Sequence, residues 1–542
     1  MKLLKFFHKT TTFLFYFAIL ASIASGFSNA ALAGLISHQI AMQEPLNNWF
    51  LNSLVFLILI AVGFDFLAKQ MLNLLVNRVV YELRLSFAGQ ILTTPFSRLE
   101  MLGIPRLFAL LTEDTQLIGN VVAELPTICI GLATLIGCVA YLAWLSPLTL
   151  FGLVLLALPI FFGYWLLQKK TRQLLQNVLL FRNQIFSTYR DLTEGMKELK
   201  LHIHRLSVFY YDHLQPLVGL SRETNTTYHR YHLLAQSVNQ FTYFVIILGL
   251  FVVSRWLGTS IEVLGAYAIM ILYLKTATMT LVSAVPRWSE AQMAIDQIEK
   301  LGFSLIMPTP IAKNANTKNA NALRLITDSV QIDVQALTYK YHQMTEENSF
   351  HIGPLTCTFK SGEIVFITGG NGSGKTTFLK LLIGLYIPKT GQITWNGRSV
   401  TAENLEQYRQ NFAVIFAEPY LFPHLMGLAG EKIDQHARAW LQRLQLTHKV
   451  KVVDGKLSTL NLSFGQRKRL ALLTAYLEER PVYIFDEWAA GQDPEFREFF
   501  YRTLLPELKA QGKLVIAITH DDQYFDAADR VLKMTPSGLN TM

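Results

Sequence analysis

The sequence predicts a multidomain protein in which an all-α polytopic membrane domain of six transmembrane helices precedes an α/β domain. The chain has 542 residues, more than one ordinary domain holds. Of these residues 51% are hydrophobic and only 16% are charged, a balance unusual for a soluble protein. The long uncharged runs lie within about the first 285 residues, whereas the chain from about residue 325 has the composition of a soluble α/β domain.

The first predicted span comes from an uncharged run between Thr10 and Ile40. At about 1.5 Å per residue this run exceeds a bilayer core of about 30 Å. A basic start followed by an apolar run also resembles a cleavable signal peptide, which is the alternative. The length of the run favours a retained transmembrane helix.

Further uncharged runs predict five more spans. One of them, residues 125–168, is too long for a single span and is interrupted by W-L-S-P at Trp144–Pro147, so we divide it there. The predicted spans are 11–38, 49–76, 119–144, 147–168, 232–254 and 261–285. Asp65 and Lys69 lie four residues apart in the second, and we expect a local ion pair rather than a cargo contact.

The Lys and Arg residues concentrate in alternate loops, as cytoplasmic loops require. The basic residues that mark the cytoplasmic side are Lys2, Lys5 and Lys9, then Arg78, Arg84, Arg98 and Arg106, and ten more from Lys169 to Arg230. The loops on the opposite side contain a single basic residue, Arg255. The pattern predicts a multi-pass protein of the cytoplasmic (inner) membrane with both termini and the α/β domain in the cytoplasm. The basic residues of these loops account for most of the net charge of +9, and they can contact anionic membrane lipid. The charge therefore requires no nucleic-acid partner.

A linker is predicted at residues 307–323, which are poor in large apolar side chains and rich in Asn, Ala, Lys and Pro. We therefore divide the chain into a transmembrane domain, 1–306, and an α/β domain, 324–542. The three cysteines form no C-x-x-C pair, which favours packing roles over a disulfide framework or a zinc site.

A phosphate-binding loop opens the second domain. The apolar run Ile364–Thr368 predicts a buried strand, and it leads through G-G-N-G-S-G-K-T-T into a helical pattern. The residues expected to bind ATP here are Gly369, Gly370, Asn371, Gly372, Ser373, Gly374, Lys375, Thr376 and Thr377. In such a loop backbone N–H groups surround the phosphates, the lysine reaches the β and γ phosphates and the hydroxyl of Thr376 binds Mg²⁺.

Two later strands carry candidate catalytic groups at their carboxyl ends, where an α/β sheet presents its ligands. P-V-Y-I-F ends in Asp486 and Glu487, and K-L-V-I-A-I-T leads to His520. Asp486 suits a second magnesium ligand, Glu487 can take a proton from attacking water, and His520 can hydrogen-bond the γ-phosphate or that water.

These residues resemble the ABC transporters, in particular exporters that fuse six membrane helices to one ATPase domain, and the resemblance covers nearly the whole chain. L-S-F-G-Q is similar to the signature loop of that family, which contacts ATP held by the partner ATPase domain. The residues concerned are Ser463, Phe464, Gly465 and Gln466. The resemblance implies a homodimer that encloses two ATP molecules, with a heterodimer as the alternative.

Other positions follow from the same resemblance. Tyr341 corresponds to the aromatic residue that stacks on adenine, with Tyr339 as its competitor, and Asp493 to the aspartate that links the two nucleotide sites. Where the family usually has a magnesium-contacting glutamine this chain has Ala417, and the neighbouring Glu418 is a possible substitute. R-L-E-M-L-G-I-P-R resembles a segment that docks on the ATPase domain, although a solvated helix explains it equally well.

The remaining departures narrow the resemblance. Phe464 replaces a glycine, and Trp488 and Ala489 replace proline and threonine. These departures support the assignment, because G-Q-R-K-R-L-A-L-L, F-D-E-W-A-A and the acidic replacement for the glutamine together resemble the branch that exports cyclic peptides and peptide siderophores. The implied function is ATP-driven export, by alternating access, of a peptide or peptide-like product of cyclic-peptide, siderophore or microcin type. The alternatives are a multidrug or lipid exporter and, in another class, an ATP-gated regulatory membrane protein; the presence of Glu487 and His520 favours active hydrolysis.

Overall fold

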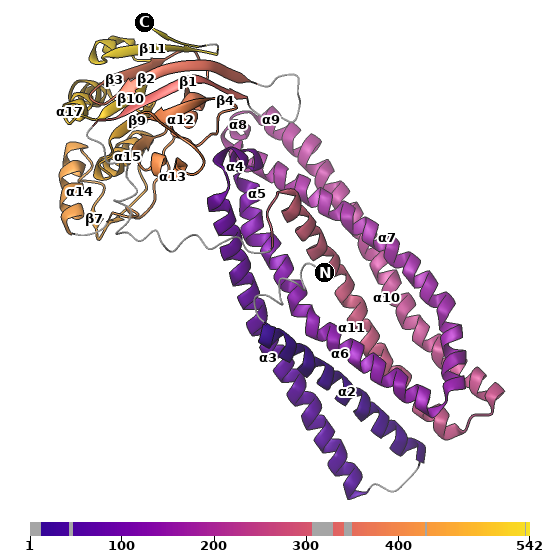
Figure 1. Ribbon diagram of the computed structural model, residues 1–542. Coiled ribbons are helices and arrows are strands. Elements are labelled where there is room, and N and C mark those ends of the chain that lie inside the picture. Colours follow the sequence, from indigo (N-terminus) through magenta and orange to yellow (C-terminus); the bar gives the residue numbers. More distant parts are fainter. Residues whose placement is uncertain (1–11, 43–46, 306–328, 341–349, 429–430, 537) are drawn as a thin grey trace. The chain divides into compact units, whose positions relative to one another are not determined.

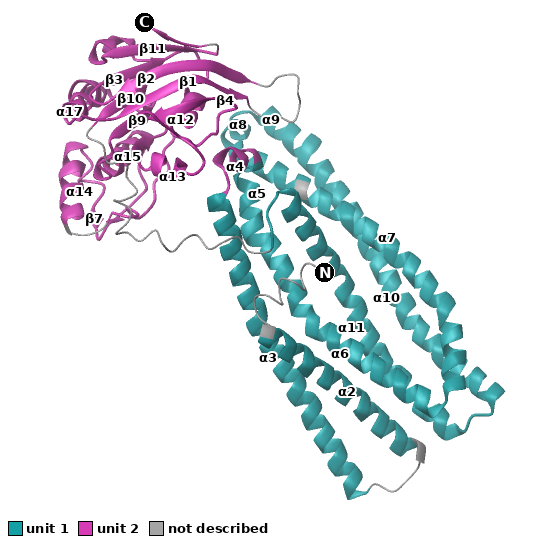
Figure 2. Cartoon of the chain, viewed as in Figure 1, with its two compact units in different colours: residues 1–93, 102–308 teal, residues 94–101, 309–542 magenta. Residues whose placement is uncertain are grey.

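The computed structural model describes residues 12–42, 47–305, 329–340, 350–428, 431–536 and 538–542. The chain forms two compact units (Figure 2). Unit 1 comprises residues 1–93 and 102–308, and unit 2 comprises residues 94–101 and 309–542. A short segment of the predicted membrane domain thus belongs to unit 2. The predicted linker, 307–323, lies outside the described residues.

Unit 1 is entirely helical over its described residues, and six stretches are long and apolar enough to cross a membrane (Figure 1). These stretches are Phe13–Ile40, Asn48–Thr93, Ile104–Leu145, Pro147–Glu194, Ile203–Leu257 and Ile261–Lys300. The main helices are α2 (Thr12–Met42), α3 (Asn48–Thr93), α6 (Thr115–Leu145), α7 (Pro147–Glu194), α10 (Gln215–Leu257) and α11 (Ile261–Lys300). The predicted fold class is confirmed.

Shorter helical pieces precede or connect these long helices. They are α4 (Phe96–Leu102), α5 (Ile104–Ala109), the π-helical turn η1 (Leu110–Asp114), α8 (Met196–Leu201), α9 (Ile203–Val208) and the π-helical turn η2 (Phe209–Leu214). Within unit 1, α2 packs against α3, α6 and α11, while α7 packs along α10. The helices α7 and α10 therefore form an antiparallel pair beside a four-helix group.

The predicted division of the third uncharged run is present at Ser146, which separates α6 from α7 in an extended conformation (φ −160°, ψ 97°). Pro147 begins α7, where a missing N–H costs no helical hydrogen bond. The hydroxyl of Tyr267 on α11 lies 2.7 Å from the carbonyl oxygens of both Leu142 and Ser146. Both carbonyl oxygens also accept from main-chain N–H groups, those of Ser146 and Leu150 at 3.2 Å, so the hydroxyl adds a bond that ties α11 to the junction of α6 and α7.

Large apolar side chains point outward along α3 and α7, as lipid-facing helices require. They include Phe56, Leu59, Val62 and Phe66 on α3, and Phe151, Leu155, Leu158 and Phe162 on α7. The expected ion pair on α3 is also present, with Lys69 Nζ 2.7 Å from the Asp65 carboxylate. Both of its side chains are at least one-third exposed, so the pair contributes little stability.

Unit 2 contains a six-stranded sheet in the order β12-β11-β3-β10-β9-β6. Its strands are β3 (Ile364–Thr368), β6 (Phe412–Ile415), β9 (Val482–Asp486), β10 (Leu514–Ile518), β11 (Arg530–Thr535) and β12 (Gly538–Thr541). All neighbouring pairs are parallel except β11 and β12. Ile518 at the end of β10 pairs with Ile367 on one side and Asp486 on the other, so three carboxyl ends meet at one edge.

A second, antiparallel sheet has the order β2-β1-β4-β5, and β7 pairs with β8. These strands are β1 (Gln331–Lys340), β2 (His351–Lys360), β4 (Thr390–Trp395), β5 (Arg398–Ser399), β7 (Val452–Val453) and β8 (Lys456–Leu457). The helical elements of unit 2 are α12 (Lys375–Leu382), α13 (Leu405–Arg409), α14 (Glu431–Arg443), α15 (Phe464–Leu477), α16 (Pro494–Phe499), η4 (Phe500–Leu504), α17 (Leu505–Ala510) and η5 (Asp522–Ala527).

The six-stranded sheet is buried on both faces. Phe366 on β3 belongs to a core that includes residues of α14 and α15, while its neighbours Val365 and Ile367 belong to a second core with residues of α12 and the antiparallel sheet. Alternate side chains of a strand point to opposite faces, which explains this division. The continuous apolar runs seen in the sequence are what a parallel sheet covered on both sides requires.

Candidate functional site

The loop after β3 adopts backbone conformations that favour glycine. Gly369, Gly372 and Gly374 have φ values of +153°, +76° and +97°. A Cβ atom on Gly369 would lie 2.5 Å from the carbonyl oxygen of Met534, and one on Gly374 would lie 2.6 Å from Ile352 Cγ2. Conformation favours glycine at all three positions, and space also requires it at Gly369 and Gly374. The loop can therefore present its N–H groups to an anion at the start of α12.

Two side chains of this loop, Lys375 and Ser373, carry hydrogen-bond donors that can bind a phosphate. Lys375 is 6% exposed, and its ammonium donates to the carbonyl oxygens of Gly369 (2.9 Å) and Gly370 (3.2 Å). Ser373 Oγ is buried and has no hydrogen-bond partner among the described residues. A buried hydroxyl without a partner is costly, and a phosphate oxygen would satisfy it. Thr376 is the second residue of α12 and is exposed, whereas the following Thr377 is buried.

The acidic strand end contains one buried and one accessible carboxylate. Asp486 is 2% exposed, and burial raises the pKa of its carboxyl, with the charge of Glu487 adding to the effect. The main chain of Ala417 hydrogen-bonds this carboxylate, and the positive charge of Lys375 also favours its ionised form. Glu487 extends past the strand in a left-handed conformation (φ +49°), which is uncommon for a residue with a side chain.

The structure places His520 and Glu487, the two candidate catalytic residues, side by side. His520 Nε2 lies 3.6 Å from Glu487 Oε1, and both side chains are partly exposed. The main-chain N–H of Glu487 donates to the carbonyl oxygen of Ile518 at 3.1 Å, which ties it to the end of β10. The arrangement places a carboxylate that can accept a proton beside an imidazole. Both lie at the edge of the sheet from which the glycine loop also starts.

The residues also fit a magnesium ion held jointly with a nucleotide. Among the described residues no group of three His, Cys, Asp or Glu side chains is placed to hold a metal by itself. Mg²⁺ usually binds through one or two protein oxygens together with substrate phosphates. Asp486 and the Thr376 hydroxyl supply the oxygen donors expected for such a site.

The L-S-F-G-Q loop forms the start of α15, with Ser463 as the N-cap. Ser463 Oγ accepts from the N–H of Gln466 (3.3 Å), and Gln466 Oε1 accepts from the N–H of Ser463 (3.1 Å), completing a capping box. A Cβ on Gly465 would lie 3.2 Å from the carbonyl oxygen of Gly491, so this glycine permits close packing. Ser463 and Phe464 are exposed, which leaves the positive end of the helix accessible.

Comparison with known proteins decides the family. A family model described as ABC transporter matches residues 352–490. Over 530 residues the chain is 32% identical to "ATP-binding protein SyrD" of Pseudomonas syringae pv. syringae, covering 96% of this chain and 92% of that protein. The chain belongs to the ABC transporters.

Two further relatives each match less than half of this ABC transporter. "Energy-coupling factor transporter ATP-binding protein EcfA1" of Mycoplasma genitalium is 34% identical over 200 residues, 35% of this chain and 71% of that protein. "Probable ABC transporter ATP-binding/permease protein" of Haemophilus influenzae is 28% identical over 240 residues, 41% of each chain. The transporter is an integral membrane protein of the fused exporter type, and its second domain binds ATP and couples its hydrolysis to transport.

The predicted adenine-stacking residue of the transporter, Tyr341, lies outside the described residues. Its competitor Tyr339 stacks on Tyr386 with ring centroids 4.8 Å apart. Glu418 is exposed and follows Ala417, whose main chain bonds Asp486. The hydrogen bond from Ala417 places the residue before Glu418 next to Asp486 at the end of β9.

Asp493 caps α16 of the transporter by accepting from the N–H of Phe496 at 2.8 Å, and it also pairs with Arg469. These contacts lower the pKa of the Asp493 carboxyl, the main-chain hydrogen bond most strongly. Gln492 Nε2 donates to the carbonyl oxygen of Gly465 at 3.1 Å, and its Oε1 accepts from Arg469 at 2.9 Å. The loop that contains Gln492 and Asp493 is therefore hydrogen-bonded to the L-S-F-G-Q loop of the same chain.

Sequence reasoning missed one residue of this region, Lys468 on α15. Its ammonium donates to the carbonyl oxygens of Glu487 (2.7 Å) and Ala490 (2.9 Å), and the indole N–H of Trp488 donates to the carbonyl oxygen of Lys468 (2.9 Å). Two features of the sequence could have indicated this residue: Lys468 lies two residues before the apolar run L-A-L-L, and an unusual tryptophan, Trp488, follows Glu487. Only the fold shows that Lys468 and Trp488 contact each other.

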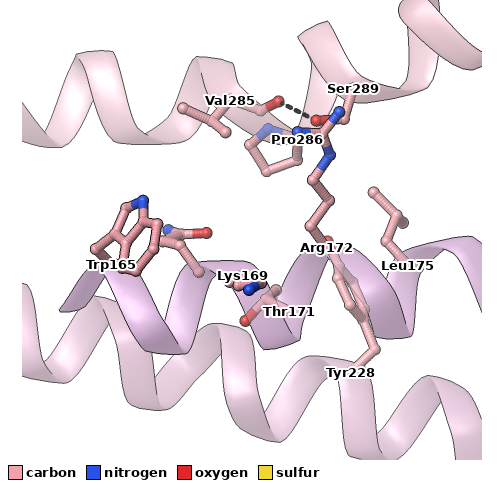
Figure 3. Close-up of a pocket in the computed structure, with 10 residues that line it drawn as sticks. Trp165, Lys169, Thr171, Arg172, Leu175, Tyr228, Val285, Pro286 and Ser289 are labelled. Carbon is pink, nitrogen blue, oxygen red and sulfur yellow. Dashed lines mark hydrogen bonds between the residues drawn. The ribbon is translucent and has the colours of Figure 1, made fainter. Parts of the chain in front are cut away.

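The membrane half of the transporter contains a cavity of about 360 Å³ lined by α7, α10 and α11 (Figure 3). Trp165, Lys169 and Arg172 line it from one face of α7, and Tyr228 and Ser289 from the other two helices. Figure 3 shows Arg172 extending toward Ser289. Within the part of the chain that the structure describes, neither cation forms an ion pair, although the Lys169 ammonium lies 6.0 Å from the Trp165 ring centroid.

Proposed function

We propose that this ABC transporter exports a peptide or peptide-like natural product, of cyclic-peptide, siderophore or microcin type, across the cytoplasmic membrane. The observation that carries the proposal is the similarity to "ATP-binding protein SyrD" over 96% of the chain, together with the departures at Phe464 and Trp488. These departures resemble the branch that exports such compounds. Trp488 is 1% exposed and packs on Phe500 with ring centroids 4.4 Å apart, so it is built into the ATPase core.

The cavity in unit 1 supports an amphipathic cargo. Trp165 and Tyr228 offer aromatic surfaces, while Lys169 and Arg172 offer positive charge to a carboxylate. Trp165 lies 18 residues after the start of α7 at Pro147, which is about 27 Å by helical rise. With both termini in the cytoplasm, this depth corresponds to the inner boundary of the membrane, where cargo enters.

The assembly we propose is a homodimer that holds two ATP molecules. Ser463 and the exposed start of α15 would contact the γ-phosphate of ATP on the partner subunit, so one chain supplies half of each site. A twofold arrangement is the simplest closed assembly of identical half-sites. A heterodimer with a related chain would satisfy the same geometry.

In the ATP hydrolysis that we propose, each residue at this edge of the sheet has its own role. Lys375 and the loop N–H groups bind the phosphates, Glu487 takes a proton from the attacking water, and His520 orients that water or the γ-phosphate. Mg²⁺ bound by Thr376 and Asp486 would neutralise charge on the phosphate oxygens. Closure of two ATPase domains around ATP would favour the outward-facing state of the membrane domain, and hydrolysis would reset it.

The experiment is ATP hydrolysis by purified protein in lipid nanodiscs, with candidate peptides added in turn. We compare the natural chain with Glu487→Gln and Ser463→Arg, the second of which places a bulky cation at the signature loop. Turnover that is stimulated by a peptide and abolished by both substitutions is the expected result. Negligible turnover of the natural chain despite ATP binding, with every peptide tried, would contradict an active pump and favour the regulatory alternative.

A further inference from the structure

Lys468 is a charged residue in the interior of the ATPase domain. It lies one turn into α15 with an exposed fraction of 2%, and burial lowers the pKa of its ammonium. Lysine is rarely buried unless its charge is paired or hydrogen-bonded, because removing an ammonium from water is costly. A buried lysine at this place therefore requires compensating contacts.

Those contacts are concentrated on the chain that follows β9. The ammonium donates to two carbonyl oxygens, of Glu487 at 2.7 Å and of Ala490 at 2.9 Å, and it lies 4.9 Å from the ring centroid of Phe464. The carbonyl oxygen of Lys468 accepts from the indole N–H of Trp488 at 2.9 Å. A single residue thus holds residues 487–490 through both its side chain and its main chain.

The segment held in this way includes the proposed proton acceptor in a disfavoured conformation. Glu487 has φ +49°, which a residue with a Cβ adopts only where its surroundings enforce it. Its N–H donates to Ile518 at 3.1 Å, and its carbonyl oxygen accepts from Lys468. With both main-chain polar groups bonded, the backbone from which the side chain extends toward His520 is held in place.

The same helix carries the signature loop at its start. Ser463 caps α15 and Lys468 follows five residues later on that helix, so a displacement of α15 moves the donor that holds Glu487. We propose that Lys468 is a positioning residue: its ammonium holds Glu487 so that the carboxylate can take a proton from the water that attacks ATP. It also connects Glu487 to α15, the helix whose start would contact the partner's nucleotide. The proposal rests on the proposed role of Glu487 as proton acceptor.

The test uses the full chain in lipid nanodiscs with three substitutions at this position. Lys468→Met keeps the length without donors, Lys468→Gln keeps an amide donor, and Lys468→Arg keeps the charge. The matched control is Arg438→Met, a cation-to-methionine change at an exposed position of α14. The readouts are kcat and KM for ATP, equilibrium binding of TNP-ATP, and hydrogen exchange of the amides of residues 487–492.

We expect Lys468→Met to lower kcat by about 10- to 100-fold, because a small misplacement of a catalytic group has effects of that size. Its KM and TNP-ATP affinity should stay within about threefold of the natural values, since the group acts on the chemical step rather than on binding. Amides 487–492 should exchange at least about tenfold faster, as expected where a local structural restraint is lost. Lys468→Gln and Lys468→Arg should recover part of kcat.

Unchanged kcat in Lys468→Met, or an equal fall of kcat, nucleotide affinity and thermal stability, would overturn the proposal. If Lys468→Met does not fold, the same comparison is made with Lys468→Gln. If the natural chain itself does not hydrolyse ATP, the proposed function fails. The positioning role of Lys468 can then still be tested by hydrogen exchange, which does not depend on ATP hydrolysis. Unchanged exchange of amides 487–492 in Lys468→Met would contradict that role.

Discussion

His520 Nε2 lies 3.6 Å from Glu487 Oε1, although 33 positions separate the two residues along the chain. The residues follow the adjacent parallel strands β10 and β9, whose ends are paired at Ile518 and Asp486. The pairing of these strands therefore brings the two proposed catalytic residues together, and the role of each can be tested separately.

Glu487→Gln should reduce kcat for ATP by about 10²- to 10³-fold, because a general base contributes roughly that factor. Nucleotide binding should remain, since the glycine loop and Lys375 are untouched. The measurement is phosphate release beside TNP-ATP binding, and Glu406→Gln, an exposed acid on α13, is the control. Retained hydrolysis would show that Glu487 is not the proton acceptor.

His520→Ala should lower kcat by about 10- to 100-fold, less than the loss of the base, because the imidazole only orients the reacting groups. His520→Gln, which can still donate a hydrogen bond, should recover part of the rate. The comparison is made at saturating ATP, with His448→Ala as the control, since His448 is exposed and lies before β7. Equal rates for His520→Ala and the natural chain would remove His520 from the site.

Asp486→Asn should stabilise the ATPase domain in the absence of nucleotide and metal. Burial raises the pKa of Asp486, so its ionised form is less favourable in the folded state than in the unfolded state. This destabilisation is absent at low pH and grows as the pH rises above about 4 and through the raised pKa. At neutral pH the asparagine variant should be more stable by on the order of 1 kcal/mol, and hydrolysis should be lost.

Thermal melting with EDTA at pH 4.5 and pH 7.5 checks this prediction. The difference in Tm between the variant and the natural chain should be larger at pH 7.5. A lower Tm for the variant at pH 7.5 would show that hydrogen bonds to the ionised carboxylate, such as that from Ala417, outweigh its burial.

Trp488→Phe should destabilise the ATPase domain by about 1–2 kcal/mol, because it removes the indole donor to the carbonyl oxygen of Lys468. Trp395→Phe is a matched control, since Trp395 is 3% exposed and its Nε1 has no partner among the described residues. Circular dichroism melts of both variants give the comparison. Equal losses would mean that packing, rather than the hydrogen bond, accounts for the effect of Trp488.

Lys380→Met should release the segment that contains Glu100. Within unit 2 the Lys380 ammonium lies 2.8 Å from Glu100 Oε1, and its side chain is only 15% exposed. Tyr386 donates its hydroxyl to the same carboxylate. The loss of the cation should speed tryptic cleavage at Arg98 severalfold through local opening. Lys432→Met on α14 is the control, and unchanged cleavage would show that apolar contacts alone hold the segment.

Local patterns in the chain were enough to predict several features. Uncharged runs indicated six membrane helices, and the break before Pro147 appears in the structure with Ser146 extended. The G-x-x-x-x-G-K-T pattern indicated the phosphate loop, because glycines and a lysine at that spacing follow from backbone conformation and charge. Such features depend on residues close together in the chain, and the sequence alone determined them.

Tertiary structure decided which distant groups meet. The pairing of β9 with β10 places His520 beside Glu487, and the packing of α15 against the end of β9 places the Lys468 ammonium under the Glu487 carbonyl. No local period marks these contacts, because they are set by strand order and by how helices cover the sheet. A buried lysine is indistinguishable from a solvated one until the fold shows which carbonyl groups compensate for its lost hydration.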